Sequence, residues 1–139
     1  MKKIVLQILI VPMIIFGIAN CGSKGGGGGG GGGGGEANLA ITLNPPANSN
    51  QPAAPQTDFP LSVSITSAMP PQGVTIDVKA APDGSTTNFF TENRSSTQAN
   101  NNFTITGTPV GPVCVVTVTV TSKTKATNTV TASYRYSRK

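Results

Sequence analysis

The chain is 139 residues long, a length that allows one ordinary domain. Ten Lys and Arg residues against five Asp and Glu residues give a net charge of +5, and two of the lysines stand at the start of the chain. Without Lys2 and Lys3 the surplus of positive charge is three, which is too small to indicate binding to nucleic acid.

The first twenty residues have the pattern of a secretory signal peptide. A basic start at residues 1–3 precedes an aliphatic stretch at residues 4–18, which Gln7 and Pro12 interrupt. About fifteen apolar residues are too few for a comfortable transmembrane helix, which needs roughly 20. We therefore expect residues 1–20 to be removed on export.

The end of this segment, Ile18-Ala19-Asn20-Cys21, resembles the lipobox of bacterial lipoproteins. The box departs from the usual pattern at Asn20, where Gly, Ala or Ser is common, and at Ile18, where Leu is common. In this respect it is similar to the relaxed boxes of spirochaetes and Bacteroidetes. The resemblance implies that Cys21 becomes the first mature residue and carries diacylglycerol and fatty acid such as palmitate. It also implies a place in the cell envelope, at the outer membrane of a Gram-negative-type bacterium.

A glycine-rich segment follows Cys21. Residues 25–35 are all glycine, and nothing in residues 21–37 could form a core. We expect a flexible tether with a reach of roughly 20 Å. A phosphate-binding loop would need a following Lys-Ser or Lys-Thr pair and a strand–loop–helix context, and the sequence has neither.

Residues 38–139 show the period-two alternation of apolar and polar residues that indicates strands. Val, Ile and Thr dominate, and Pro- and Gly-containing turn signals separate the apolar runs. The alternation predicts seven strands: around residues 39–43, 61–65, 74–78, a short one at Phe89 or Phe90, then 103–105, 114–121 and 130–136.

Seven short strands in about a hundred residues resemble an immunoglobulin-like or fibronectin-III-like β-sandwich. The chain lacks the Cys…Trp…Cys pin of antibody-type domains, which favours bacterial or fibronectin-like variants. We expect a single all-β domain. In immunoglobulin order its tethered start would lie beside the loops at 68–73, 93–102 and 122–128. The loops at 44–57, 81–88 and 107–112 would lie with the C-terminus at the opposite end.

The sequence offers little material for an active site. Cys114 falls on the inward side of its strand, and a reactive thiol usually needs a nearby histidine, which the sequence lacks. The five carboxylates (Glu36, Asp58, Asp77, Asp83 and Glu92) are scattered, so no catalytic pair, calcium loop or other metal site is indicated. We expect no enzyme activity, no cofactor and no metal.

The remaining hypothesis is a lipid-anchored binding module that contacts another protein or a host surface. The candidate binding residues are Phe89 and Phe90 on the short strand and Arg135 and Arg138 on the last one. A small glycan-binding lipoprotein of an uptake system is the alternative, because one of the two phenylalanines could present an exposed ring. A third possibility is a subunit that exchanges a strand, if the last strand were unpaired.

Overall fold

The computed structural model describes residues 35–139. The predicted signal peptide, Cys21 and most of the predicted tether lie outside the described residues. Within the part that is described, no helix has the length and apolar character needed to cross a membrane.

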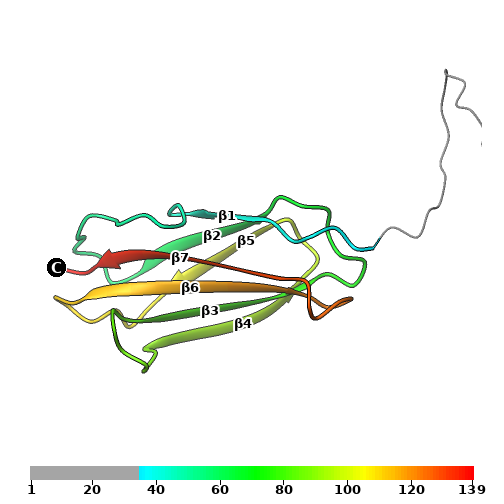
Figure 1. Ribbon diagram of the computed structural model, residues 1–139. Helices are drawn as coiled ribbons and strands as arrows, with labels where there is room; N and C mark the ends of the chain where they lie inside the picture. Colours follow the sequence, from blue (N-terminus) through cyan, green and yellow to red (C-terminus); the bar gives the residue numbers. More distant parts are fainter. Residues whose placement is uncertain (1–34) are drawn as a thin grey trace, which may run out of the picture. The chain divides into compact units, whose positions relative to one another are not determined.

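The described chain forms seven strands in two antiparallel sheets, which confirms the predicted all-β sandwich (Figure 1). One sheet has the order β1-β2-β5 and the other the order β4-β3-β6-β7. The strands are β1 (Ile41–Asn44), β2 (Phe59–Ile65), β3 (Val74–Pro82), β4 (Phe90–Ser96), β5 (Asn100–Ile105), β6 (Val113–Ser122) and β7 (Thr129–Ser137).

The position of β4 distinguishes this sandwich from an antibody constant domain. There the fourth strand belongs to the sheet of the first two strands, whereas here β4 pairs with β3 along its whole length. The arrangement is therefore a sandwich of the immunoglobulin-like or fibronectin-III-like kind whose fourth strand belongs to the larger sheet.

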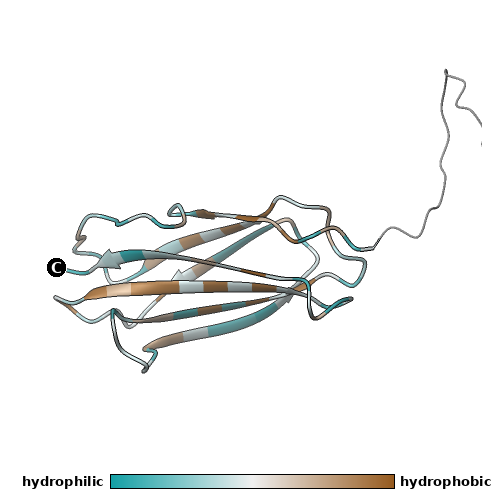
Figure 2. Ribbon diagram, in the orientation of Figure 1, coloured by the Kyte–Doolittle hydropathy of each residue, from teal (hydrophilic) through white to brown (hydrophobic). Residues whose placement is uncertain are grey.

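The core lies between the sheets and follows the predicted alternation. On β6, the side chains from Cys114 to Val120 alternate between fully buried and half-buried, and the change of hydropathy along the ribbon is visible in Figure 2. Cys114 is completely buried, as predicted. The largest fully buried aliphatic side chains belong to β2, β3, β5 and β6, two strands from each sheet: Leu61, Val63, Val74, Ile76, Val78, Ile105, Val116, Val118 and Val120.

Residues 93–102 were predicted to be a loop, but the structure shows that most of them belong to strands. β4 continues to Ser96 and β5 begins at Asn100, so only residues 97–99 connect them. β4 is an edge strand with no fully buried side chain, so its sequence shows no apolar alternation. The asparagines at the start of β5 bond to serines on β2, namely Asn102 with Ser62 and Asn100 with Ser64, each at 2.8 Å.

The start of the domain is fixed at one end of the sandwich. Asn128, in the β6–β7 loop, accepts a hydrogen bond from the Leu39 amide at 2.9 Å and donates to the Ala37 carbonyl at 2.9 Å. Glu36 accepts from both Ser122 and Asn128. Glu36 and Ala37, which the sequence assigned to the tether, therefore contact the domain.

The opposite end carries the last residues of the chain. We call it the C-terminal end and define it as the connections 45–58, 83–89 and 106–112 together with residues 137–139. The first and third connections bond to the final residues: Ala54 N–H to Ser137 at 3.1 Å, Lys139 N–H to Ala54 at 3.0 Å and Gly111 N–H to Arg138 at 2.9 Å. The predicted grouping of these loops is thus observed.

Candidate binding site

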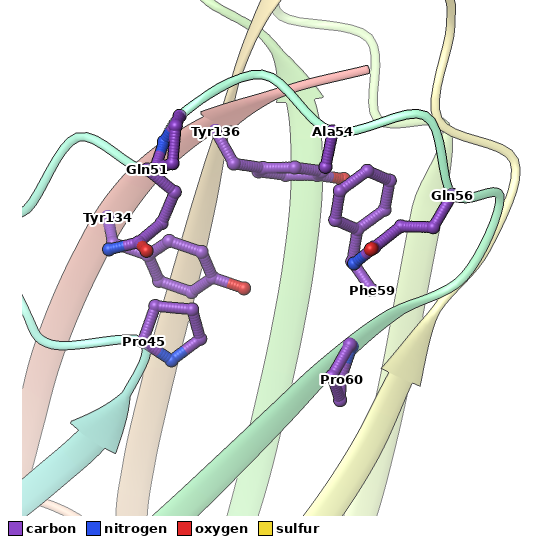
Figure 3. Close-up of a pocket in the computed structure, with 9 residues that line it drawn as sticks. Pro45, Gln51, Ala54, Gln56, Phe59, Pro60, Tyr134 and Tyr136 are labelled. Carbon is purple, nitrogen blue, oxygen red and sulfur yellow. The ribbon is translucent and has the colours of Figure 1, made fainter. Parts of the chain in front are cut away.

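A pocket of about 230 Å³ opens at the C-terminal end, between the end of β7, the beginning of β2 and the 45–58 connection (Figure 3). Its wall is made mostly of rings and contains no charged side chain. The lining residues are three aromatic residues, three prolines and three others: Phe59, Tyr134, Tyr136, Pro45, Pro52, Pro60, Gln51, Gln56 and Ala54.

The 45–58 connection forms its side of the pocket because part of it runs parallel to β7. The amide of Gln51 donates to Arg135 at 2.8 Å, the amide of Arg135 donates to Ser49 at 2.9 Å, and Asn48 donates to Ser133 at 2.7 Å. These bonds pair the outer edge of β7 with residues 48–54. They also place Gln51 and Ala54 over the two tyrosines.

Two of the pocket's rings are held in fixed positions. The centroids of Phe59 and Tyr136 are 4.4 Å apart with an interplanar angle of 57°, and the Tyr136 hydroxyl bonds to the Thr108 hydroxyl at 2.7 Å. Burial raises the pKa of Tyr136 to about 12, although the bond to Thr108 opposes the shift. Tyr136 is therefore a neutral, rigid part of the wall with its polar atom engaged.

Tyr134 differs from Tyr136 in one respect. Its side chain is only 2 % exposed, and its hydroxyl is buried without a hydrogen-bond partner among the described residues. Figure 3 shows this hydroxyl directed toward the middle of the ring of lining residues. Burial, followed by the proximity of Tyr136, raises the pKa of Tyr134 strongly, so that the group stays protonated and can donate a hydrogen bond.

The surface beside the pocket combines exposed apolar and charged side chains. Val110 and Val113 are the large apolar side chains of the described part that are most exposed, at 62 % and 47 %. A second hollow, of about 290 Å³, shares Gln51 and Tyr136 with the first and is also lined by Val113, Asp83 and Arg135. Apolar groups exposed beside a concave site are characteristic of interaction surfaces.

The two predicted arginines lie at this end but have different surroundings. Arg135 is exposed and its Nε donates to Asp83 at 3.0 Å. Such an exposed pair contributes little to stability, so its side chain is free to exchange partners. Arg138 is half-buried and donates from Nη1 to the Thr108 carbonyl at 3.1 Å, while its Nε is buried without a partner in the described part.

The two predicted phenylalanines are not in the same patch as the arginines. Phe89 and Phe90 are half-buried and pack against the core, at the start of β4. β4 and β7 are opposite edges of the four-stranded sheet, three strand spacings or about 14 Å apart. The four residues therefore do not form one surface.

The described carboxylates do not gather into a site. Asp77 pairs with Lys79 at 2.7 Å, Asp83 pairs with Arg135, and Glu92 pairs with Arg94. Within residues 35–139, no group of three or more Cys, Asp or Glu side chains is placed to hold a metal ion.

The period-two alternation of residues 130–136 predicts that Tyr134 and Tyr136 point inward, but it does not identify them as pocket residues. The missed signal is the 45–58 connection, which is long, rich in Pro, Asn and Gln, and without a strand of its own. Connections of this length in a small domain often have a function.

Comparison of the chain with protein-family models, with curated proteins and with solved structures gives no match.

Proposed function

We propose that the protein is a non-enzymatic binding module of the bacterial cell envelope, anchored through a lipid on Cys21, that binds a protein partner with its C-terminal end. The observation that supports it best is the combination at this end of a ring-lined pocket, the exposed Val110 and Val113, and the loosely paired Arg135. Binding energy at protein interfaces comes from a few side chains, among which aromatic residues and arginine are enriched.

The arrangement of the ends also supports this proposal. The start of the domain is bonded to the β6–β7 loop through Glu36 and Asn128, whereas the pocket lies at the other end with the last residues. A lipid anchor that precedes Glu36 would therefore leave the C-terminal end directed away from the attachment point.

The two alternative functions have less support. A glycan platform would need an exposed aromatic face, and both Phe89 and Phe90 are half-buried against the core. Strand exchange would need an unpaired last strand, but β7 pairs with β6 on one side and with residues 48–54 on the other.

Photo-crosslinking in intact cells tests the binding surface. A photoreactive amino acid at Val113 or Val110 is expected to give a discrete protein adduct, because both side chains point to solvent beside the pocket. The matched control is Ala126, an exposed residue in the β6–β7 loop at the opposite end. Equal adducts from all three positions, or adducts from Ala126 alone, would contradict the proposal, and a saccharide adduct at Val113 would favour the glycan alternative.

The anchor is tested separately with Cys21→Ala. This variant should incorporate no radiolabelled fatty acid, and it should either leave the membrane fraction or accumulate as the uncleaved precursor. Lys24→Ala, a nearby change that keeps the cysteine, serves as the control. Unchanged labelling and fractionation of Cys21→Ala would show that the lipobox interpretation is wrong.

A further inference from the structure

The pocket beside Tyr134 has a size that fits one ring. Its volume of about 230 Å³ exceeds the roughly 150 Å³ of an apolar cavity that binds benzene. It is smaller than the roughly 300 Å³ at which sites for drug-sized ligands begin. A single six-membered ring with one substituent therefore matches the available space.

The composition of the wall selects an uncharged and largely apolar ring. All nine lining residues are uncharged, and six of them present aromatic or proline rings. A charged group would lose its hydration without gaining a counter-ion. A sugar ring would bring several hydroxyl groups, and the polar side chains of the wall are few: the amides of Gln51 and Gln56, the first of which already donates to Ser49, and the buried Tyr134 hydroxyl.

The unpartnered hydroxyl adds one specific requirement. Buried polar groups in proteins nearly always have a hydrogen-bond partner, so the Tyr134 hydroxyl indicates a missing group at this place. Because this oxygen is closed off from solvent, a ligand hydroxyl would satisfy it by displacing the side chains that cover it. The neighbouring Tyr136 hydroxyl needs no ligand group, because it already forms a hydrogen bond with Thr108.

We infer that the pocket receives the phenol ring of a tyrosine side chain of the partner, with the ligand's hydroxyl bonded to that of Tyr134. This inference rests on the proposed function, since it names the group of the partner that enters the pocket. Tyrosine combines an apolar ring with one hydroxyl at its tip, which is the combination that the wall and the orphan hydroxyl require.

The test uses the fact that the sequence has two tyrosines and both line the pocket. The full chain is labelled with 3-fluorotyrosine, inserted into lipid nanodiscs and titrated with N-acetyltyrosinamide or N-acetylphenylalaninamide while its ¹⁹F signals are recorded. Both compounds should cause saturable shifts, and the tyrosine compound should bind roughly three- to tenfold more tightly, the effect of one net hydrogen bond.

Two matched variants assign this preference to one hydroxyl. Tyr134→Phe should abolish the preference and should fold normally, because the atom that it removes has no partner. Tyr136→Phe should retain the preference, because its hydroxyl faces Thr108. In each variant the remaining fluorotyrosine reports on binding. Ala54→Leu, which keeps the backbone bond to Ser137 but narrows the pocket, should weaken both compounds at least about tenfold.

Several results would overturn the inference. These are a lack of saturable shifts with either compound, a preference that survives Tyr134→Phe, or saturable binding of N-acetylglucosamine without binding of the tyrosine compound. The crosslinking experiment at Val113 tests the proposed function independently of these titrations. A protein adduct there without phenol binding would remove only the inference, whereas phenol binding without an adduct would count against the proposed function.

Discussion

Asn128 shows how much of the domain's start depends on one side chain. Its amide oxygen accepts from Leu39 and its amide nitrogen donates to both Ala37 and Glu36, so that three residues of the entering chain are bonded to one loop residue. Because the side chain is buried, each of these bonds replaces one that water would otherwise make. The contacts between the chain and the domain therefore begin before the first strand.

Cys114 behaves as a small apolar side chain in this fold. It is fully buried on β6, and burial raises the pKa of its thiol. Cys114→Ser should lower the free energy of unfolding by about 1–3 kcal/mol, because it buries a hydroxyl whose acceptor, the Pro112 carbonyl, is 3.7 Å from the present sulfur and too far for a good hydrogen bond to oxygen. Chemical denaturation measures this loss, and Cys114→Ala, which adds no polar group, is the comparison.

The same cysteine should react with thiol reagents slowly in the native protein and rapidly after denaturation. Rapid labelling of the native protein would contradict the assignment of Cys114 to the core.

For single residues, the sequence predicts whether a side chain points into the core but not which atoms surround it. The alternation along residues 130–136 places Tyr134 and Tyr136 inward, and the structure agrees. The Tyr136 hydroxyl has a hydrogen-bond partner because Thr108, from a loop distant in the sequence, lies beside it. The Tyr134 hydroxyl has no partner among the described residues. No local pattern of residues contains this information.

Among the elements, the two strands that pair on both sides in the larger sheet were the most predictable. β3 and β6 lie inside their sheet, and their alternation of buried and half-buried residues is plain in the sequence. β4 is an edge strand, and its residues 92–96 are polar on both faces. Arg94 covers the Phe103 ring at 4.4 Å, which gives the open side of this strand an apolar contact that no periodicity reveals.

The turn before β3 requires glycine. Gly73 has φ = +75°, and a Cβ atom there would lie 2.4 Å from the Ser96 carbonyl oxygen. Gly84 has a similar φ of +80° but open space around it. Substitutions at Gly73 and Gly84 therefore distinguish the cost of a steric clash from the cost of backbone strain alone.

We expect Gly84→Ala to cost about 1 kcal/mol, the strain of a left-handed residue. Gly73→Ala should cost roughly 3 kcal/mol, because the clash adds to the strain. Thermal and urea unfolding of both variants measure the difference, and an equal loss of stability would mean that the β4 end moves away freely.

The whole molecule should lose stability in alkaline solution. Tyr134 and Tyr136 have pKa values raised above the ordinary value near 10, so above pH 10 the unfolded chain releases their protons and the folded domain keeps them. The free energy of unfolding should fall between pH 10 and pH 12 by up to about 1.4 kcal/mol per pH unit for each tyrosine.

Urea unfolding at a series of pH values measures this slope. Tyr134→Phe should reduce it by about half, since one of the two titrating groups is removed. A slope that does not change in this variant would show that other groups govern the alkaline loss.

The placement of the two ends has a mechanical consequence. β1 and β7 both run toward the C-terminal end, the first beginning next to the bonds of Glu36 and the last ending beside the pocket. A pull between the proposed membrane attachment and the proposed partner would therefore act along the strands. Under tension in this direction the backbone bonds of a ladder are loaded together in shear, rather than opened one at a time. The sandwich would resist such a load better than one gripped at neighbouring strand ends, which suits a module held at one end and loaded at the other.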